Sequence, residues 1–438
     1  MNKIALYVGT ILLTCAASLG QQYKVLYDFG SDPSNGVVPL FNPVADKSGN
    51  LYGVTQSGGA PGTCFGGCGV VFELSPNGHG AAIETVLYTF CQGGTKFDCP
   101  DGGEPNGLII DSAGNLYGTT ENGGTQQGGN GVAFELSPPT LPGGAWTYEV
   151  LYNFCSIYNN HVCDDGTAPY GTLTFDASGD LYGTTIAGGA NQAGTGGVVF
   201  KLSPGANGWT ESVLYNFCAL QGCADSYRAN QGVTFDKRGN LYGTTTSSGY
   251  GSALCTVTCG ALFKLSPGTQ GWTLSILAWF SPIDGDLGQV LFPGPVRIDP
   301  AGNLYTTLAL GGNYTGFFDG NGEVLRVTPS GKVQSFLFDF SDGSDPLYGV
   351  ILDTSRRALY GVTGGTGDDP FLGNVFEIND AGKETVLYQF CQLPNCSDGH
   401  NPSGLYEDKS GNLFGLTASG GAYMQGSGGA GVAFEITR

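Results

Sequence analysis

One unit of sequence recurs seven times along this chain of 438 residues. Each copy is marked by a leucine and an aromatic residue, which usually follow a tight turn, and successive marker leucines stand 54 to 65 residues apart. The markers are Leu51, Leu116, Leu181, Leu241, Leu304, Leu359 and Leu413. A repeat that fills the chain in this way predicts one array of similar units and leaves no room for a second domain.

Each unit holds four short runs of residues with the composition of β-strands. In the second unit these runs cover residues 107–111, 115–120, 131–136 and 149–154. They are rich in Val, Ile, Leu, Tyr, Phe and Thr, turn residues bound them, and no stretch keeps the 3.6-residue period of a helix. We therefore predict an all-β chain with essentially no helix, a seven-bladed β-propeller with four antiparallel strands per blade.

The two ends of the repeat array complement each other. A strand-like run at residues 25–29 precedes the first unit, whereas the seventh unit stops after its third run, at residues 431–436. We expect the N-terminal run to supply the missing fourth strand of the last blade and so close the ring, because a closed ring hides its sheet edges. Residues 21–438 are thus predicted to form a single domain.

Residues 1–20 have the pattern of a secretory signal peptide. Lys3 is followed by a mostly apolar stretch, and Ser18-Leu19-Gly20 suits cleavage before Gln21. The sequence therefore predicts a secreted or periplasmic protein. A lipid anchor on Cys15 is the alternative, disfavoured by Thr14 before it.

The repeat resembles that of the GloVer tandem-repeat proteins, a secreted bacterial group named for its glycine-rich unit. The segments NLYGTT, GVVFKLSP and GWTESVLYNF and the Gly-Gly step after the second strand carry the resemblance over nearly all of residues 21–438. Units five and six match less well, with Thr306 in place of Gly and Arg357 in place of Asn. The resemblance implies a repeat fold and export, and no particular activity.

The cysteines predict disulfide bridges. Of 13 cysteines, Cys15 lies in the signal segment and the other 12 form six close pairs. The pairs are Cys64/Cys68, Cys91/Cys99, Cys155/Cys163, Cys218/Cys223, Cys255/Cys259 and Cys391/Cys396. We expect a disulfide within each pair, because the chain is predicted to be exported, while bridges between different pairs stay an open alternative. A zinc site is disfavoured, because structural zinc sites use four Cys or His ligands and the chain has only three His.

The pairs also predict which face of the ring is functional. All six lie in connections from fourth to first strands or from second to third strands, which emerge on one face of an up-and-down propeller. Loops held by a rigid scaffold commonly carry function, so we expect the site on this long-loop face.

The net charge of −20 is unevenly distributed. The long loops hold 16 acidic residues and only two basic ones, Lys96 and Arg228, whereas the short hairpins opposite hold Lys47, Lys237, Arg238, Arg356, Arg357 and Lys409. Such an acidic chain is not expected to bind nucleic acid. The Asp-Gly steps, as at Asp101, Asp165 and Asp398, favour a turn-capping role for those carboxylates.

We predict a monomer without a membrane-spanning segment.

In a repeat protein, a site is sought where the units differ. The residues that depart from the repeat in the long loops are aromatic or charged, and they are candidates for stacking on a sugar ring. These ligand-binding candidates are Tyr158, His161, Tyr227, Arg228, Asp286, Tyr314, Phe317 and Phe318. Packing of these aromatic residues onto the adjacent blade is the alternative.

Catalytic motifs are absent from the sequence: it has no GxSxG elbow, no HExxH helix and no phosphate-binding glycine loop. Our leading hypothesis is a non-enzymatic propeller that binds an extracellular carbohydrate or an envelope protein, without a cofactor. The rival is a hydrolase or lyase acting on a polysaccharide or lactone, with Ca²⁺ as an optional metal. Acidic groups of the first strands that converge on the ring axis favour this rival.

Overall fold

The computed structural model describes residues 21–438 with gaps. The gaps are 33, 60–63, 65, 93, 95–97, 127, 142, 192–193, 248–259, 281–292, 310–321, 337–344, 366–372 and 424–428. Within the described ranges the chain is all-β. Its helical elements there are two three-residue 3₁₀ turns, η2 (Gln221–Cys223) and η4 (Pro394–Cys396). None of the described helical segments is long and apolar enough to cross a membrane.

The strands pair in successive antiparallel groups, in chain order. The first half of the chain forms β2 (Gly36–Ala45), β3 (Leu51–Gly58), β4 (Val70–Pro76) and β5 (Ala82–Thr89); then β6 (Gly103–Pro105), β7 (Ile109–Ile110), β8 (Leu116–Asn122), β9 (Val132–Ser137) and β10 (Thr147–Asn153); then β13 (Thr167–Phe175), β14 (Leu181–Ala187), β15 (Val198–Gly205) and β16 (Gly208–Asn216). A small hairpin, β11 (Tyr158–Asn159) and β12 (Val162–Cys163), precedes the third group.

The second half repeats the pattern. It forms β17 (Tyr227–Phe235), β18 (Leu241–Ser247), β19 (Gly260–Gly268) and β20 (Gly271–Phe280); then β21 (Arg297–Ile298), β22 (Leu304–Leu308), β23 (Glu323–Val327) and β24 (Val333–Phe336); then β25 (Val350–Asp353), β26 (Ala358–Thr363), β27 (Asn374–Ile378) and β28 (Glu384–Gln389); and finally β29 (His400–Glu407), β30 (Leu413–Ser419), β31 (Val432–Thr437) and β1 (Gln22–Asp28).

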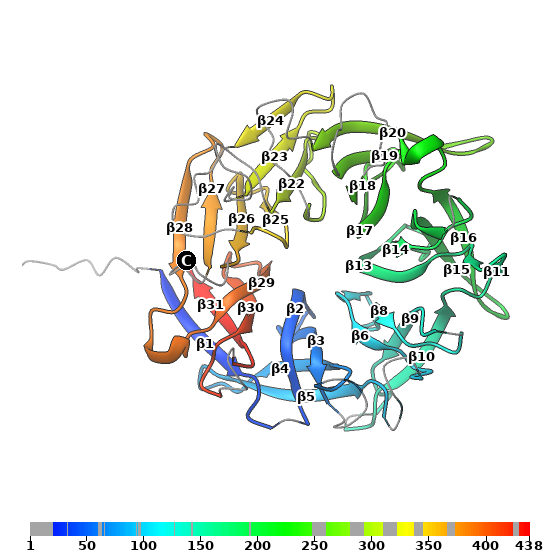
Figure 1. Cartoon of the computed structure of the whole chain (residues 1–438). Coiled ribbons are helices and arrows are strands. Elements are labelled where there is room, and N and C mark those ends of the chain that lie inside the picture. The colour runs from blue at the N-terminus through cyan, green and yellow to red at the C-terminus, as the bar shows by residue number, and fades with distance from the viewer. Residues whose placement is uncertain are drawn as a thin grey trace, which may run out of the picture.

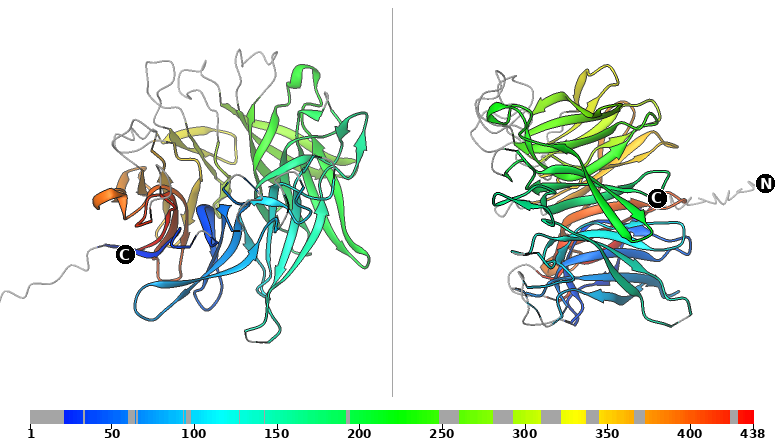
Figure 2. Two further views of the ribbon diagram at one scale, coloured as in Figure 1. Left: turned by 60° about the horizontal axis from the view of Figure 1, so that its bottom comes forward. Right: turned by 90° about the vertical axis from the view of Figure 1, so that its right-hand side faces the viewer.

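The sheets stand side by side in a ring, and the first strand of each sheet lies nearest the centre (Figure 1). Two further views show the sheets packed around this ring (Figure 2). Neighbouring first strands contact each other: Thr172 in β13 pairs in parallel with Gly232 in β17, and the Asn42 side chain accepts a hydrogen bond from the Leu405 amide at 3.0 Å. These contacts fix the inner wall of the ring.

The N-terminal strand pairs with the last strand, as predicted. β1 is antiparallel to β31, with Gln22 opposite Thr437 and Asp28 opposite Val432. The Tyr23 ring stacks on Tyr388 of the preceding sheet at 3.7 Å between ring centroids. The sheet formed by β29, β30, β31 and β1 therefore joins the two ends of the chain.

The repeated tripeptide Leu-Tyr-Gly is explained by packing within each sheet. A side chain on Gly183 in β14 would begin 2.5 Å from the ring of Phe200 in β15, so the glycine makes room for the phenylalanine. The same glycine–phenylalanine pairing recurs in five other sheets, at Gly53/Phe72, Gly118/Phe134, Gly243/Phe263, Gly361/Phe376 and Gly415/Phe434. In the remaining sheet, Thr306 replaces the glycine and Leu325 replaces the phenylalanine opposite it. The smaller partner thus compensates for the larger residue, and the core keeps its density.

Candidate functional site

A cavity of about 440 Å³ lies on the ring axis. Residues of the first strands of the sheets, or of the segments leading into them, form its wall. Phe41 and Tyr348 line it, and Phe41 lies edge-on to Tyr348 at 6.4 Å and to Tyr170, which is off the wall, at 5.7 Å between centroids. The other wall residues come mainly after these three in their strands, so the cavity extends toward the short hairpins. This position differs from the expected one, because the long-loop face was predicted to carry the site.

The pairing register shows which wall residues depart from the repeat. Arg297 is paired with Tyr305, at a position that the other sheets fill with uncharged residues. Those residues are Val44, Ile109, Thr174, Thr234, Ile351 and Tyr406. Glu407 is paired with Leu413, one position further along. Its counterparts are Ala45, Ile110, Phe175, Phe235, Ile298 and Leu352.

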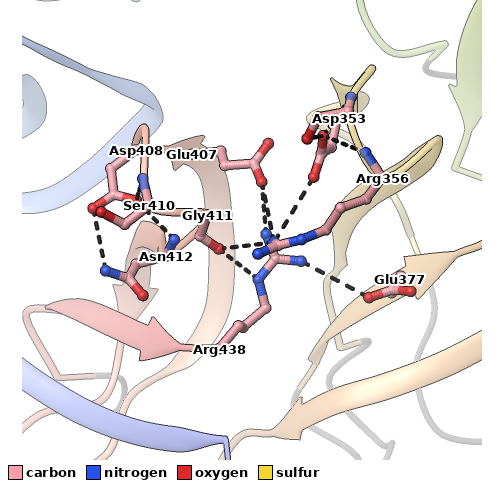
Figure 3. A network of polar contacts seen from close by, with 10 residues as sticks. Asp353, Arg356, Glu377, Glu407, Asp408, Ser410, Gly411, Asn412 and Arg438 are labelled. Carbon is pink, nitrogen blue, oxygen red and sulfur yellow. Dashed lines mark hydrogen bonds and ion pairs between the residues drawn. The ribbon is translucent and has the colours of Figure 1, made fainter.

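Glu407 is the one acidic residue on the described cavity wall. Its side chain is 17% exposed, and Oε1 accepts a hydrogen bond from Nη2 of Arg438 at 2.7 Å. Burial raises the pKa of the Glu407 carboxyl, and the nearby charge of Asp353 raises it further, while Arg438 opposes both effects. Figure 3 shows these groups converging between the two neighbouring sheets.

Asp353, at the end of β25, is shifted in the opposite direction. Burial alone would raise its pKa, but hydrogen bonds from the Ser355 hydroxyl and from the backbone amides of Ser355 and Arg356, together with the nearby Glu407 carboxyl, lower it overall. The Ser355 hydroxyl donates to Oδ1 at 2.6 Å and the Arg356 amide at 2.9 Å. The site therefore pairs a carboxyl that favours its protonated form with a carboxylate that favours its ionised form, which is the pattern of an acid–base pair.

Two arginines hold this acid pair in place. The Arg438 side chain is 9% exposed, its Nε donates to the Gly411 carbonyl at 2.6 Å, and its guanidinium lies 4.0 Å from the centroid of the Tyr360 ring. Arg356 Nη1 lies 3.7 Å from Glu407 Oε1 and 3.8 Å from Asp353 Oδ2. Because its donors are fixed on several sides, Glu407 is held in one orientation.

Half of the predicted ligand-binding residues lie in the described ranges, and they form two separate groups. Tyr158 is 58% exposed, and its hydroxyl lies 3.5 Å from Nδ1 of His161 in the β11–β12 connection. The Arg228 guanidinium lies 5.9 Å from the Tyr227 ring centroid, and the Arg228 amide donates to the Gly196 carbonyl at 2.8 Å. Neither group lines the axial cavity. The other predicted residues, Asp286, Tyr314, Phe317 and Phe318, lie outside the described residues.

The structure confirms the within-pair disulfides at five pairs. They are Cys64–Cys68, Cys91–Cys99, Cys155–Cys163, Cys218–Cys223 and Cys391–Cys396. Cys255 and Cys259 lie outside the described residues, as do Cys15 and the signal segment. The argument against a cysteine tetrad was incomplete, because Cys64, Cys68, Cys91 and Cys99 have sulfurs within 4.8 Å of one another. They are joined as two disulfides, so no thiolate is available there in this state.

The turn-capping role predicted for the Asp-Gly carboxylates agrees with the structure. Asp165 accepts hydrogen bonds from the Tyr152 hydroxyl at 2.6 Å and from the Ser156 amide at 2.8 Å. Asp398 does the same for Tyr388 and the Gln392 amide, at 2.7 and 2.9 Å. These carboxylates shape the bridged loops, and so they are not free to bind a ligand.

The ring of mainly antiparallel sheets belongs to the class of β-propeller-like folds. The chain itself belongs to the Gloeobacter/Verrucomicrobia repeat family, whose model matches residues 8–160 and 83–289. A search of curated proteins gave no match.

Several solved structures share the fold. PorZ, a surface component of the type-IX secretion system of Porphyromonas gingivalis, is 13% identical with a TM-score of 0.51, covering 94% of this chain and 48% of its own. The periplasmic gluconolactonase PpgL of Pseudomonas aeruginosa is 13% identical with a TM-score of 0.46, covering 91% of this chain and 98% of its own. The aldose sugar dehydrogenase of Streptomyces coelicolor, in its PQQ-bound form, is 11% identical with a TM-score of 0.44, covering 95% and 98%.

These comparisons correct the leading functional hypothesis. A non-enzymatic binding module was expected, but the similar structures are named mainly as gluconolactonases and sugar dehydrogenases, which are enzymes. The fold is supported by the likeness to PorZ, at a TM-score of 0.51, and at these identities none of the similar structures assigns a reaction to this chain. The disulfides are consistent with an extracytoplasmic location.

Proposed function

We propose that the protein is an extracytoplasmic hydrolase or lyase that acts on a polysaccharide or a lactone in the axial cavity. The observation that carries this proposal is Glu407, a carboxyl of raised pKa on the cavity wall, beside an Asp353 whose pKa is lowered. A raised carboxyl pKa suits general acid–base catalysis, because it moves the proton exchange of the group toward neutral pH.

The proposed chemistry uses Glu407 as the proton-transfer group. In hydrolysis, the Glu407 carboxylate accepts a proton from water as the water oxygen bonds to the electrophilic carbon, and Glu407 then returns that proton to the leaving oxygen. In a lyase reaction, the Glu407 carboxylate removes the proton from a ring carbon, the electrons of that C–H bond form a C=C bond as the C–O bond on the adjacent carbon breaks, and Glu407 then gives the proton to the leaving oxygen. Asp353 stays ionised and favours the return of the proton to Glu407, while Arg438 positions the carboxyl.

We further propose that the repeat array forms a seven-bladed propeller closed by β1 and that the mature protein is secreted. The successive four-stranded groups and the β1–β31 pairing support this blade count. No metal is assigned to the cavity. Ca²⁺ takes about 6–8 oxygen ligands, several of them carboxylates, and the described wall has Glu407 as its one acidic residue. Turnover is therefore expected to withstand a chelator.

The test measures turnover over a panel of sugar lactones, by acid release, and of polysaccharides, by released ends and unsaturated products. Glu407→Gln is compared with the control Glu377→Gln. Glu377 Oε2 lies 3.8 Å from Arg438 Nη1, as a second carboxylate near this arginine, but Glu377 does not line the cavity. Glu407→Gln should lower kcat by about 10²–10⁴-fold, the range for loss of a general acid–base group, whereas Glu377→Gln should change it little. Equal activity of both variants, or no turnover of any panel member by the wild type, refutes the proposal.

A further inference from the structure

Arg297 places a positive charge inside the axial cavity, and the repeat does not require it. Its backbone position at the start of β21 is filled by Val, Ile, Thr or Tyr in the other sheets, all of which allow the same strand to form. Packing therefore does not explain an arginine here. Arg297 lines the cavity in which a ligand would lie.

The described protein groups do not neutralise this charge. Among the residues that the structure describes, no carboxylate forms an ion pair with Arg297, and Glu407 across the same cavity is paired with Arg438 instead. Arg297 is half-buried, and this partial removal from water without a counter-charge lowers its pKa. A bound anion would supply the missing charge.

The remaining wall indicates what kind of anion fits. Side-chain amides of Asn42 and Gln231 and hydroxyls of Thr172 and Thr174 share the cavity with Arg297. Amides and hydroxyls are suited to the hydroxyl groups of a sugar, and a guanidinium binds a planar carboxylate through two parallel hydrogen bonds. The cavity volume of about 440 Å³ falls in the range of small-molecule sites, roughly 300–1,000 Å³.

We infer that Arg297 binds the carboxylate of an acidic sugar, so that the substrate class is a uronic or aldonic acid or a polymer that contains one. This inference rests on the proposed function for its saccharide part, whereas the anion site itself stands on the position of Arg297. Arg297 is thus a specificity-determining residue, on a different sheet from the Glu407 acid–base group.

The test measures binding and needs no turnover. The full chain carrying Glu407→Gln, which is expected to be inactive, is titrated with D-glucuronate, oligogalacturonate, neutral D-glucose and inorganic phosphate by calorimetry. We expect an acidic sugar to bind at least about 10-fold more tightly than glucose, as for a charge-assisted pair. Arg297→Gln in the same background should abolish that difference. Arg357→Gln, a control at an arginine with a 77% exposed side chain, should preserve it.

Each outcome bears on the inference. No binding of either acidic sugar, or equal binding by Arg297→Gln, overturns it, provided that the melting temperature shows the variant to be folded. Phosphate binding as tight as that of the sugar acids assigns a simple anion site and overturns the sugar part. Arg297-dependent binding of a sugar acid without wild-type turnover of any substrate leaves the anion site intact and refutes the proposed reaction alone.

Discussion

Replacing Arg438 by methionine tests how strongly the acid pair depends on its cationic clamp. Methionine keeps much of the apolar stem but removes the charge, the hydrogen bonds to Glu407 and Gly411, and the contact with the Tyr360 ring. The Arg438 side chain is 9% exposed, so water does not readily replace these partners.

The magnitude follows from this burial. Removing one partner of a buried ion pair costs about 3–5 kcal/mol. The raised pKa of Glu407 places the effect at the lower end, because the orphaned carboxyl can take up a proton. We therefore expect the free energy of unfolding to fall by about 3 kcal/mol at pH 7. Arg357→Met, at the exposed arginine, should change it by less than about 0.5 kcal/mol.

Urea unfolding followed by intrinsic fluorescence measures these changes, and the m-value checks that both variants unfold as the wild type does. A double-mutant cycle with Glu407→Gln should give a coupling of about 1–3 kcal/mol that shrinks as Glu407 becomes protonated at low pH. Additive effects of the two substitutions, or an Arg438→Met variant as stable as Arg357→Met, would show that the clamp does not hold Glu407.

Three further predictions concern the scaffold. Burial raises the pKa of Glu211 from 4.5 to about 8, so between these pH values the folded state binds a proton that the unfolded state releases. The free energy of unfolding should therefore fall as the pH rises from about 4.5 to 8. In urea unfolding across that range, Glu211→Gln should reduce this fall by an amount on the order of 2 kcal/mol, after allowance for partial exposure. Gly183→Ala forces a methyl group against Phe200 and should cost about 1–3 kcal/mol, an effect that Phe200→Leu in the same chain should partly relieve. Replacing the Cys155–Cys163 bridge by two serines should lower the free energy of unfolding by about 2–3 kcal/mol. Turnover should stay unchanged, because the bridged loop does not line the cavity, and a loss of turnover would place the site on the long loops instead.

The sequence was sufficient for much of the fold because its information there is local and repeated. The seven markers recur with the same flanking strands, so a weak preference in one unit is reinforced by the others. The missing strand of the last unit and the spare strand at residues 25–29 correctly predict the β1–β31 pairing. The close cysteine pairs likewise identified their own partners.

The site was harder to predict because departures from the repeat were sought in the loops. Arg297 and Glu407 lie within the first strands, one position apart in the repeat, where the surrounding pattern is apolar. Aligning the first strands by their Leu-Tyr markers would have revealed both residues. Whether strand residues point to the axis or into a sheet interface depends on the bulges of each first strand, and spacing alone does not give them.

The cysteine tetrad shows another limit of sequence reasoning. Cys64–Cys68 lies between the second and third strands of one sheet, and Cys91–Cys99 lies in the connection to the next sheet. They meet because these connections are neighbours in space, as shown by the hydrogen bond from the Glu104 amide to the Cys68 carbonyl at 2.9 Å. Such a contact depends on how adjacent sheets pack, which a list of spacings does not contain.

The pairing of β1 with β31 has a mechanical consequence. Because the strands are antiparallel with Gln22 opposite Thr437, residues 22 and 437 emerge at the same end of the seam. A force that pulls these two points apart loads the hydrogen bonds one after another, as in a zipper, whereas shear would load them all at once. Under this force the β1–β31 pairing is thus the part of the ring that opens most easily. The rest of the ring carries no load until these two strands have separated.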